Sequence, residues 1–102
     1  MRKFESGTIC LTDLVSDRMY KDELFNDFLH NAINCHLFGD WGDLCEEDKA
    51  LNEEAVRLGN GRIMSVYKQN DDTLWIITEA DRSYTTILFP DEYPKIRGNK
   101  SI

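Results

Sequence analysis

Four side chains of the types that bind transition metals lie within sixteen residues: His30, Cys35, His36 and Cys45. Zinc sites usually place two such ligands at short, regular intervals, as in CxxC, so that both lie on one side of a turn. These four residues lack that spacing, and His30 and Cys35 point in different directions on an expected helix. Cys35 and His36 are sequence neighbours whose side chains also diverge, which disfavours a Cys–His nucleophile pair. We therefore expect no metal ion, no cofactor and no catalytic residue.

A second candidate is the acidic segment GDWGDLCEEDKALNEEA at residues 39–55. Such a charge run is commonly the solvated side of a helix, and the alternative is a surface that binds a partner. Trp41 lies between two Gly-Asp steps in this segment. It is either a plug over the core or an exposed anchor for a partner, and the second role would support a binding surface. The expected partner-binding residues are Asp40, Trp41, Asp43, Glu46, Glu47, Asp48, Glu53 and Glu54, with Asp71 and Asp72 at an expected hairpin tip.

A third candidate is the charged turn formed by Glu79, Asp81 and Arg82. The planar guanidinium of arginine binds carboxylates through two hydrogen bonds, so Arg82 is expected to hold Asp81 or a carboxylate of the 40–43 loop. We interpret the turn as structural, and a binding role is the alternative.

The residues that position these groups show two periodicities. A short strand is expected at 8–11, a helix capped by Thr12, and a stronger helix from about 21 to 37 that ends at Gly39. A third helix is expected to start with Asp43 and Glu46 as a capping pair. Its buried stripe is expected to consist of Leu44, Leu51, Ala55 and Leu58.

After residue 61 the period changes to two, with strands expected at 62–68, 73–79 and 84–89. Short connections make these strands an antiparallel meander. The predicted fold class is α+β, with an N-terminal short strand and three helices packed on a C-terminal three-stranded antiparallel meander. Residues 1–94 are expected to form one domain, and residues 95–102 a flexible tail.

The chain has 102 residues and a formal charge of −7, with 19 acidic and 12 basic residues. This excess disfavours direct binding to a nucleic-acid backbone. It either keeps a small protein soluble or suits a protein that competes with nucleic acid for a basic groove. No apolar run is long enough for a membrane span, and no signal-peptide core is present. Three irregularly spaced cysteines indicate reduced thiols, as in a cytoplasm.

Three segments resemble a family of small proteins carried on bacterial plasmids and integrative elements: GDWGDLCEEDKALNEEAV, GRIMSVY and LWIITEADRSYTTILFPDEY. The resemblance runs in order from about Thr8 to Tyr93, and its most specific motifs are GDWGD and WIITEADRS. Members are often labelled as a restriction–modification subunit, although this chain is far too short for a methyltransferase and has no methyltransferase motif. It departs from the family pattern in its cysteine-containing region at 35–45 and its polar tail.

The resemblance implies an accessory protein of a mobile genetic element. Some small acidic proteins of such elements are counter-defence factors, including anti-CRISPR inhibitors of the type II effector nuclease. We therefore expect a non-enzymatic inhibitor in the cytoplasm of the bacterial host cell, a monomer or homodimer that binds a protein partner and neither nucleic acid nor membrane. One alternative is a small enzyme or ligand-binding protein using Asp40, Trp41, Asp43, Glu79 and Arg82. The other is a plasmid-maintenance protein that acts as a homo-oligomer through Tyr67, Trp75 and Tyr84.

Overall fold

A computed structural model of the chain describes residues 2–93, and the tail expected at 95–102 lies outside these residues. The elements are β1 (Thr8–Leu11), α1 (Asp13–Lys21), α2 (Glu23–Phe38), α3 (Glu46–Leu58), β2 (Ile63–Gln69), β3 (Asp72–Thr78), β4 (Tyr84–Leu88) and the 3-10 helix η1 (Pro90–Glu92). The predicted α+β class is confirmed.

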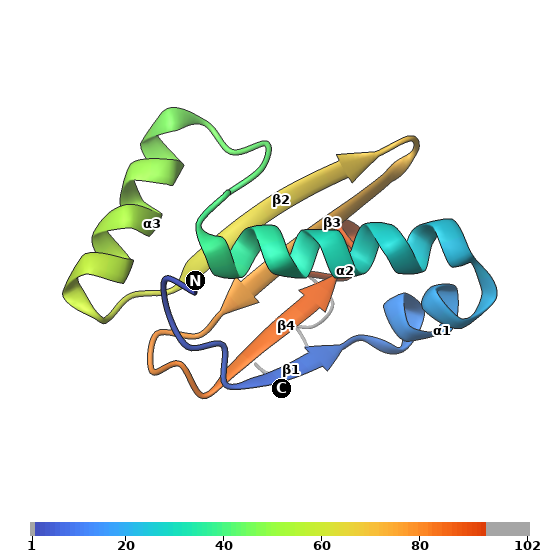
Figure 1. The fold of residues 1–102 in the computed structure, drawn as a ribbon, viewed down its shortest axis with the longest axis horizontal. Coiled ribbons are helices and arrows are strands. Elements are labelled where there is room, and N and C mark those ends of the chain that lie inside the picture. Colours follow the sequence, from blue (N-terminus) through green and yellow to red (C-terminus); the bar gives the residue numbers. More distant parts are fainter. Residues whose placement is uncertain (1, 94–102) are drawn as a thin grey trace.

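The described strands form one sheet in the order β1-β4-β3-β2, with α2 running across one face (Figure 1). The pairs β2–β3 and β3–β4 are antiparallel, which confirms the meander. The N-terminal strand β1 joins this sheet in parallel beside β4, so the sheet has four strands and is mixed. A parallel pair needs a long crossover connection, and the three helices with β2 and β3 provide it.

The main core lies between α2 and the sheet. Phe25 and Leu29 of α2 are buried against Leu74, Ile76 and Ile87 of the central strands. The period of α2 therefore places its apolar stripe on the sheet, as the sequence predicts. The helix ends at Gly39, whose φ of 88° gives the left-handed cap that glycine favours.

The expected cap on α1 is confirmed, because the Thr12 hydroxyl accepts the Val15 N–H at 3.3 Å. The same hydroxyl donates to Glu92 Oε2 at 3.0 Å. Glu92 also accepts the Phe89 N–H at 2.8 Å, so one carboxylate links η1 to the start of α1. The hydrogen bond between Thr12 and Glu92 thus joins two residues that are eighty positions apart in the sequence.

Helix α3 lies beside the edge of β2 and not over the sheet (Figure 1). Its expected cap is wrong. Of its expected stripe, Ala55 is buried and Leu44 is partly buried against the core, so the stripe is wrong at Leu51 and Leu58. The helix begins at Glu46 with Cys45 as an N-cap that makes no side-chain hydrogen bond, so Asp43 does not cap it. Leu51 is 64% exposed and Leu58 is also exposed, whereas Ala55 and the polar Asn52 are buried. A helix on an edge buries a narrow line of residues, and here that line includes an amide.

Candidate partner-binding surface

The loop between α2 and α3 is attached to the edge of β2 by backbone hydrogen bonds. The Val66 N–H donates to the Trp41 carbonyl at 3.3 Å, and the Asp43 N–H donates to the Val66 carbonyl at 2.7 Å. Gly42 lies between them with a φ of 72°, and its position faces the Val66 backbone directly. The GDWGD sequence thus forms one extra bridge on the sheet. This bridge holds the residues on either side of it in place.

Trp41 is a plug over the core. Its side chain is 4% exposed. Its ring stacks on Phe4 at a centroid distance of 6.1 Å and meets the ring of His36 edge-on at 6.0 Å. The indole N–H donates to Glu53 Oε2 at 2.7 Å, so the polar end of the ring is satisfied from α3. Of the two roles that the sequence left open, the structure shows the buried one.

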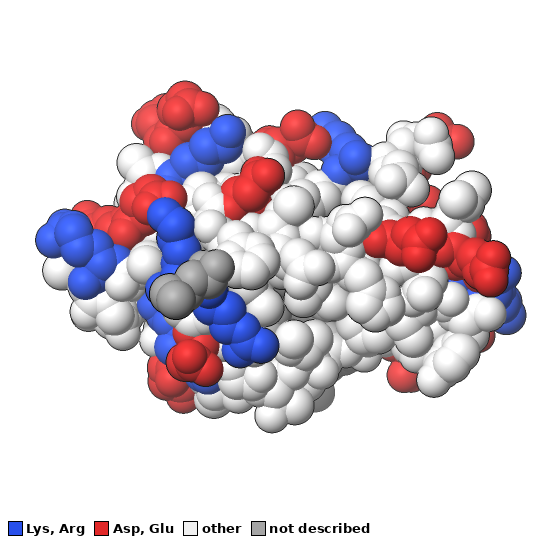
Figure 2. All heavy atoms as spheres, in the orientation of Figure 1, with Lys and Arg blue, Asp and Glu red and all other residues white. Residues whose placement is uncertain are grey.

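The expected acidic residues of α3 are exposed, and they point in more than one direction from the helix. Glu46, Glu47, Asp48, Glu53 and Glu54 are all exposed. Basic groups are interspersed with them: Lys49 Nζ lies 3.5 Å from Glu46 Oε2, and Lys3 Nζ lies 4.0 Å from Glu53 Oε1. Figure 2 shows this mixture over α3, and a largely uncharged surface across the middle of the same view. The helix is therefore acidic in excess but is not a continuous sheet of negative charge.

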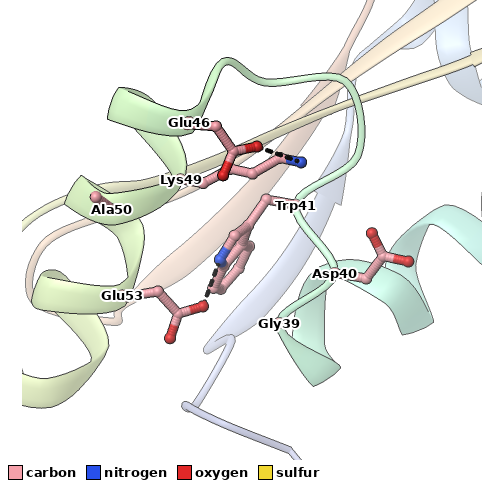
Figure 3. A pocket seen from close by; sticks show the side chains of 7 residues that line it. All are labelled: Gly39, Asp40, Trp41, Glu46, Lys49, Ala50 and Glu53. Carbon is pink, nitrogen blue, oxygen red and sulfur yellow. Dashed lines mark hydrogen bonds and ion pairs between the residues drawn. The ribbon is translucent and has the colours of Figure 1, made fainter.

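A cleft of about 430 Å³ separates α3 from the loop that follows α2 (Figure 3). Glu46 and Glu53 border it from α3, and Asp40 lies on the opposite side, at the end of α2. Its other lining residues are Gly39, Trp41, Lys49 and Ala50. Of the group proposed for an enzyme or ligand binder, only Asp40 and Trp41 line this cleft, whereas Asp43, Glu79 and Arg82 do not.

The two acidic residues of the β2–β3 hairpin do not join this surface. The hairpin tip lies at the end of the sheet away from α3 (Figure 1). Asp72 accepts two hydrogen bonds from the Arg18 guanidinium, at 2.9 and 2.8 Å, and this pairing raises the pKa of Arg18. Of the two acidic residues at the hairpin tip, Asp71 is exposed and Asp72 is half-buried. The structure therefore divides the expected partner-binding residues into two separate groups.

The charged turn differs from expectation in what it binds. Among residues 2–93, Arg82 donates to four backbone carbonyls and to no carboxylate. The carbonyls are those of Gly61 at 2.7 Å, Ala55 at 3.0 Å, Ala80 at 3.0 Å and Glu79 at 3.2 Å. The Asp81 carboxylate instead accepts from the Ser83 N–H and hydroxyl, which lower its pKa. Arg62 pairs with Glu79 at 3.3 Å. The turn thus joins the end of α3 to the β3–β4 connection.

His36 belongs to a buried polar chain that sequence reasoning missed. It is 1% exposed, and its ring nitrogens lie 2.5 Å from Ser65 Oγ and 2.9 Å from Thr78 Oγ1. Thr78 contacts Thr85, whose hydroxyl donates to the Ser6 carbonyl at 2.7 Å. Burial lowers the pKa of His36 to about 3, so the ring is neutral. The signals for this network were the place of His36 on the apolar stripe of α2 and the polar residues at core-facing positions of three expected strands.

The other potential metal ligands do not gather around His36. His30 is exposed and contacts the Asn26 carbonyl within its own helix at 2.8 Å. Cys10, Cys35 and Cys45 are free thiols, and burial is the main reason why the pKa of Cys35 is raised. Within residues 2–93, no three His, Cys, Asp or Glu side chains are grouped so that they could hold a metal ion.

Within the same residues, no helix has both the length and the apolar character needed to cross a membrane. Comparison of the chain with protein-family models, with curated proteins and with solved structures gives no match in any of the three.

Proposed function

We propose that this chain is a non-enzymatic accessory protein of a mobile genetic element, which inhibits a defence protein by occupying its basic, nucleic-acid-binding surface. The observation that carries the proposal is the set of exposed carboxylates on one rigid helix, α3. The candidate target is the type II CRISPR effector nuclease, and this choice rests on the resemblance of the GDWGD and WIITEADRS segments to proteins of mobile DNA.

The physical basis is electrostatic competition. The carboxylates of α3 are held in place by the helix. They carry the same negative charge as the phosphates that a basic groove normally binds. A groove lysine or arginine can approach the cleft beside Glu46 and Glu53 of α3, whereas the Asp40 carboxylate points away from the cleft (Figure 3). Attraction between exposed charges is screened over about 8–10 Å at physiological ionic strength, so the binding should weaken as salt is added.

The test compares two variants with the same change in net charge. One converts the acidic residues of α3 to amides: Glu46→Gln, Glu47→Gln, Asp48→Asn, Glu53→Gln and Glu54→Gln. The matched control converts five exposed acidic residues elsewhere, Asp13→Asn, Glu23→Gln, Asp27→Asn, Asp71→Asn and Asp91→Asn. Binding to the effector nuclease is measured with and without guide RNA, together with target cleavage.

The expected result is that the native chain and the control variant bind the effector and reduce cleavage, whereas the α3 variant does neither. Guide RNA loaded beforehand should compete with the native chain. Undiminished cleavage at an excess of the native chain would contradict the choice of target. Equal loss of binding in both variants would contradict the role of α3.

The cleft supports a second candidate, the binding of a small cationic ligand between α3 and the loop that follows α2. Glu46 and Glu53 border the cleft from α3, and carboxylates suit a guanidinium or ammonium group. Titration with arginine amide in a Trp75→Phe background, which leaves Trp41 as the fluorophore, tests this candidate. A saturable change that is lost in Glu46→Gln would support it, and no change at high ligand concentration would contradict it.

A further inference from the structure

The outer edge of β1 carries backbone groups without a partner. The Thr8 N–H donates to the Ser83 carbonyl and the Thr12 N–H to the Ile87 carbonyl, each at 3.2 Å, so the even-numbered residues of β1 face β4. In a parallel pair both backbone groups of a residue point to the same side. The N–H and C=O groups of Ile9 and Leu11 therefore point away from the sheet. None of them has a hydrogen-bond partner among residues 2–93, and Figure 1 shows β1 as an outermost strand.

The opposite edge of the same sheet is covered at Met64 and Val66, and Lys68, the next outward residue, protects the edge with a charged side chain. On β2 the outward backbone groups of Met64 are bonded by the Asn52 side chain, and those of Val66 by the 41–43 loop. Proteins usually protect edge strands with such covers, or with charged side chains and proline, because an open edge pairs with another strand. The β1 sequence, Thr-Ile-Cys-Leu, has neither a charge nor a proline. Of the two edges, β1 alone is left able to accept a strand.

We infer that β1 pairs antiparallel with β1 of a second copy of this chain, about a two-fold axis through Cys10. Antiparallel strands exchange both backbone hydrogen bonds at alternate residue pairs. If Ile9 faces Leu11 of the second copy, the symmetry places Leu11 opposite the second Ile9, and all the outward groups of both strands are used. A register centred on Ile9 would oppose Leu11 to Gly7, whose φ of 63° interrupts the strand. A register centred on Leu11 would oppose Ile9 to Asp13, which is already helical.

This register also suits the side chains. The Ile9 side chain is 40% exposed in the single chain and would be covered by Leu11 of the second copy, on the helix side of the sheet. No two like charges face each other within the paired strands. Cys10 would face Cys10 of the second copy at a pair without hydrogen bonds, where Cα atoms are about 4.5 Å apart. This separation falls within the range that a disulfide spans.

The pairing is tested first by mass. Under reducing conditions, sedimentation equilibrium should show twice the monomer mass of 11.9 kDa as concentration rises. Ile9→Lys places a charge on the edge and should return the mass to that of the monomer. Leu24→Lys, the same change at another exposed apolar residue, should leave it doubled. Ile9→Pro removes the outward N–H without removing a bond to β4, and serves as a second variant if Ile9→Lys does not fold.

The register is tested by cross-linking. Cys35→Ser/Cys45→Ser keeps Cys10 alone, and Cys10→Ser/Cys35→Ser keeps Cys45, which is equally classed as exposed. Diamide takes the two electrons and two protons of a thiol pair, so it can form a disulfide between copies. The Cys10 chain should form the covalent dimer several times faster than the Cys45 chain. Equal cross-linking rates of the two chains would overturn the inference. So would a dimer that persists in both Ile9→Lys and Ile9→Pro, or a monomer mass for the native chain at about 1 mM protein, a concentration at which even weak complexes form.

Discussion

The side-chain amide of Asn52 both donates a hydrogen bond to the backbone of Met64 and accepts one from it. Asn52 Nδ2 donates to the Met64 carbonyl at 2.7 Å, and the Met64 N–H donates to Asn52 Oδ1 at 3.2 Å. An amide carries a donor and an acceptor at the spacing of a peptide group, so this side chain replaces a neighbouring strand at the edge of β2. It also attaches α3, and with it the acidic surface, to the sheet.

The first prediction concerns this attachment. Asn52→Ala leaves both backbone groups of Met64 without their partner and is expected to lower the free energy of unfolding by about 2 kcal/mol. Urea denaturation followed by circular dichroism measures the change. Asn31→Ala, on the exposed side of α2, is the matched control and should change stability little. An equal effect of the two substitutions would mean that the edge contact does not stabilise the fold.

A second prediction compares two glycines with nearly the same φ. Gly42 has a φ of 72° and Gly59 a φ of 74°. A Cβ on Gly42 would lie 1.9 Å from the Val66 carbonyl oxygen, whereas a Cβ on Gly59 would meet nothing within 4 Å. Gly59→Ala therefore adds only backbone strain, about 1 kcal/mol. Gly42→Ala adds a backbone clash and should cost about 3 kcal/mol or prevent the loop from docking.

Thermal unfolding of both alanine variants measures this difference directly. Loss of the loop contact in Gly42→Ala should also expose Trp41 and shift its fluorescence to longer wavelength. Similar stability of the two variants would contradict the close approach of Gly42 to β2.

Local signals in the sequence were sufficient for most elements. The Thr12 cap, the Gly39 end of α2 and the three alternating strands follow from residues that are close in the chain. The position of β1 was not predictable in this way, because its partner β4 is more than seventy residues away. The buried side of α3 was not predictable for a related reason. Its leucines have heptad-like spacing, but the helix packs on the edge of β2, where Asn52 and Ala55 are the buried residues.

The candidate surface was partly predictable. The exposed carboxylates of α3 follow from composition and period, since charged residues on a helix are rarely buried. Which carboxylates accept hydrogen bonds within the protein depends on tertiary contacts. Glu53 accepts from Trp41, and Asp72 accepts from Arg18 of another element. No local pattern could reveal that the hairpin acids and the α3 acids lie at different ends of the molecule.

A third prediction concerns Arg82, which joins the end of α3 to the β3–β4 turn. Its guanidinium lies between backbone carbonyls and over the Phe4 ring, 5.9 Å from the ring centroid. Arg82→Ala removes these charge-assisted bonds and should cost about 2 kcal/mol of unfolding free energy. Arg82→Lys keeps the charge but not the planar fork, and should recover only part of the loss. Arg57→Ala, at an exposed residue in the last turn of α3, is the control. A full recovery in Arg82→Lys would show that charge alone matters.

The fourth prediction is a dependence of stability on pH through His36. Burial lowers the pKa of His36 from 6.5 to about 3, and its contacts are hydroxyls and the rings of Phe4 and Trp41. Below pH 6.5 the unfolded chain binds a proton that folded His36 does not accept until about pH 3. Stability should therefore fall as the pH decreases through this window, at up to about 1.4 kcal/mol per pH unit.

Urea denaturation between about pH 6.5 and 5 isolates this effect, because most carboxylates titrate at lower pH. His36→Gln removes the titrating ring and should flatten the slope, whatever its effect on stability at pH 7. His30→Gln changes the exposed histidine of the same helix and should keep the slope of the native chain. If the slope survives in His36→Gln and disappears in His30→Gln, the buried ring is not the group whose protonation opposes folding.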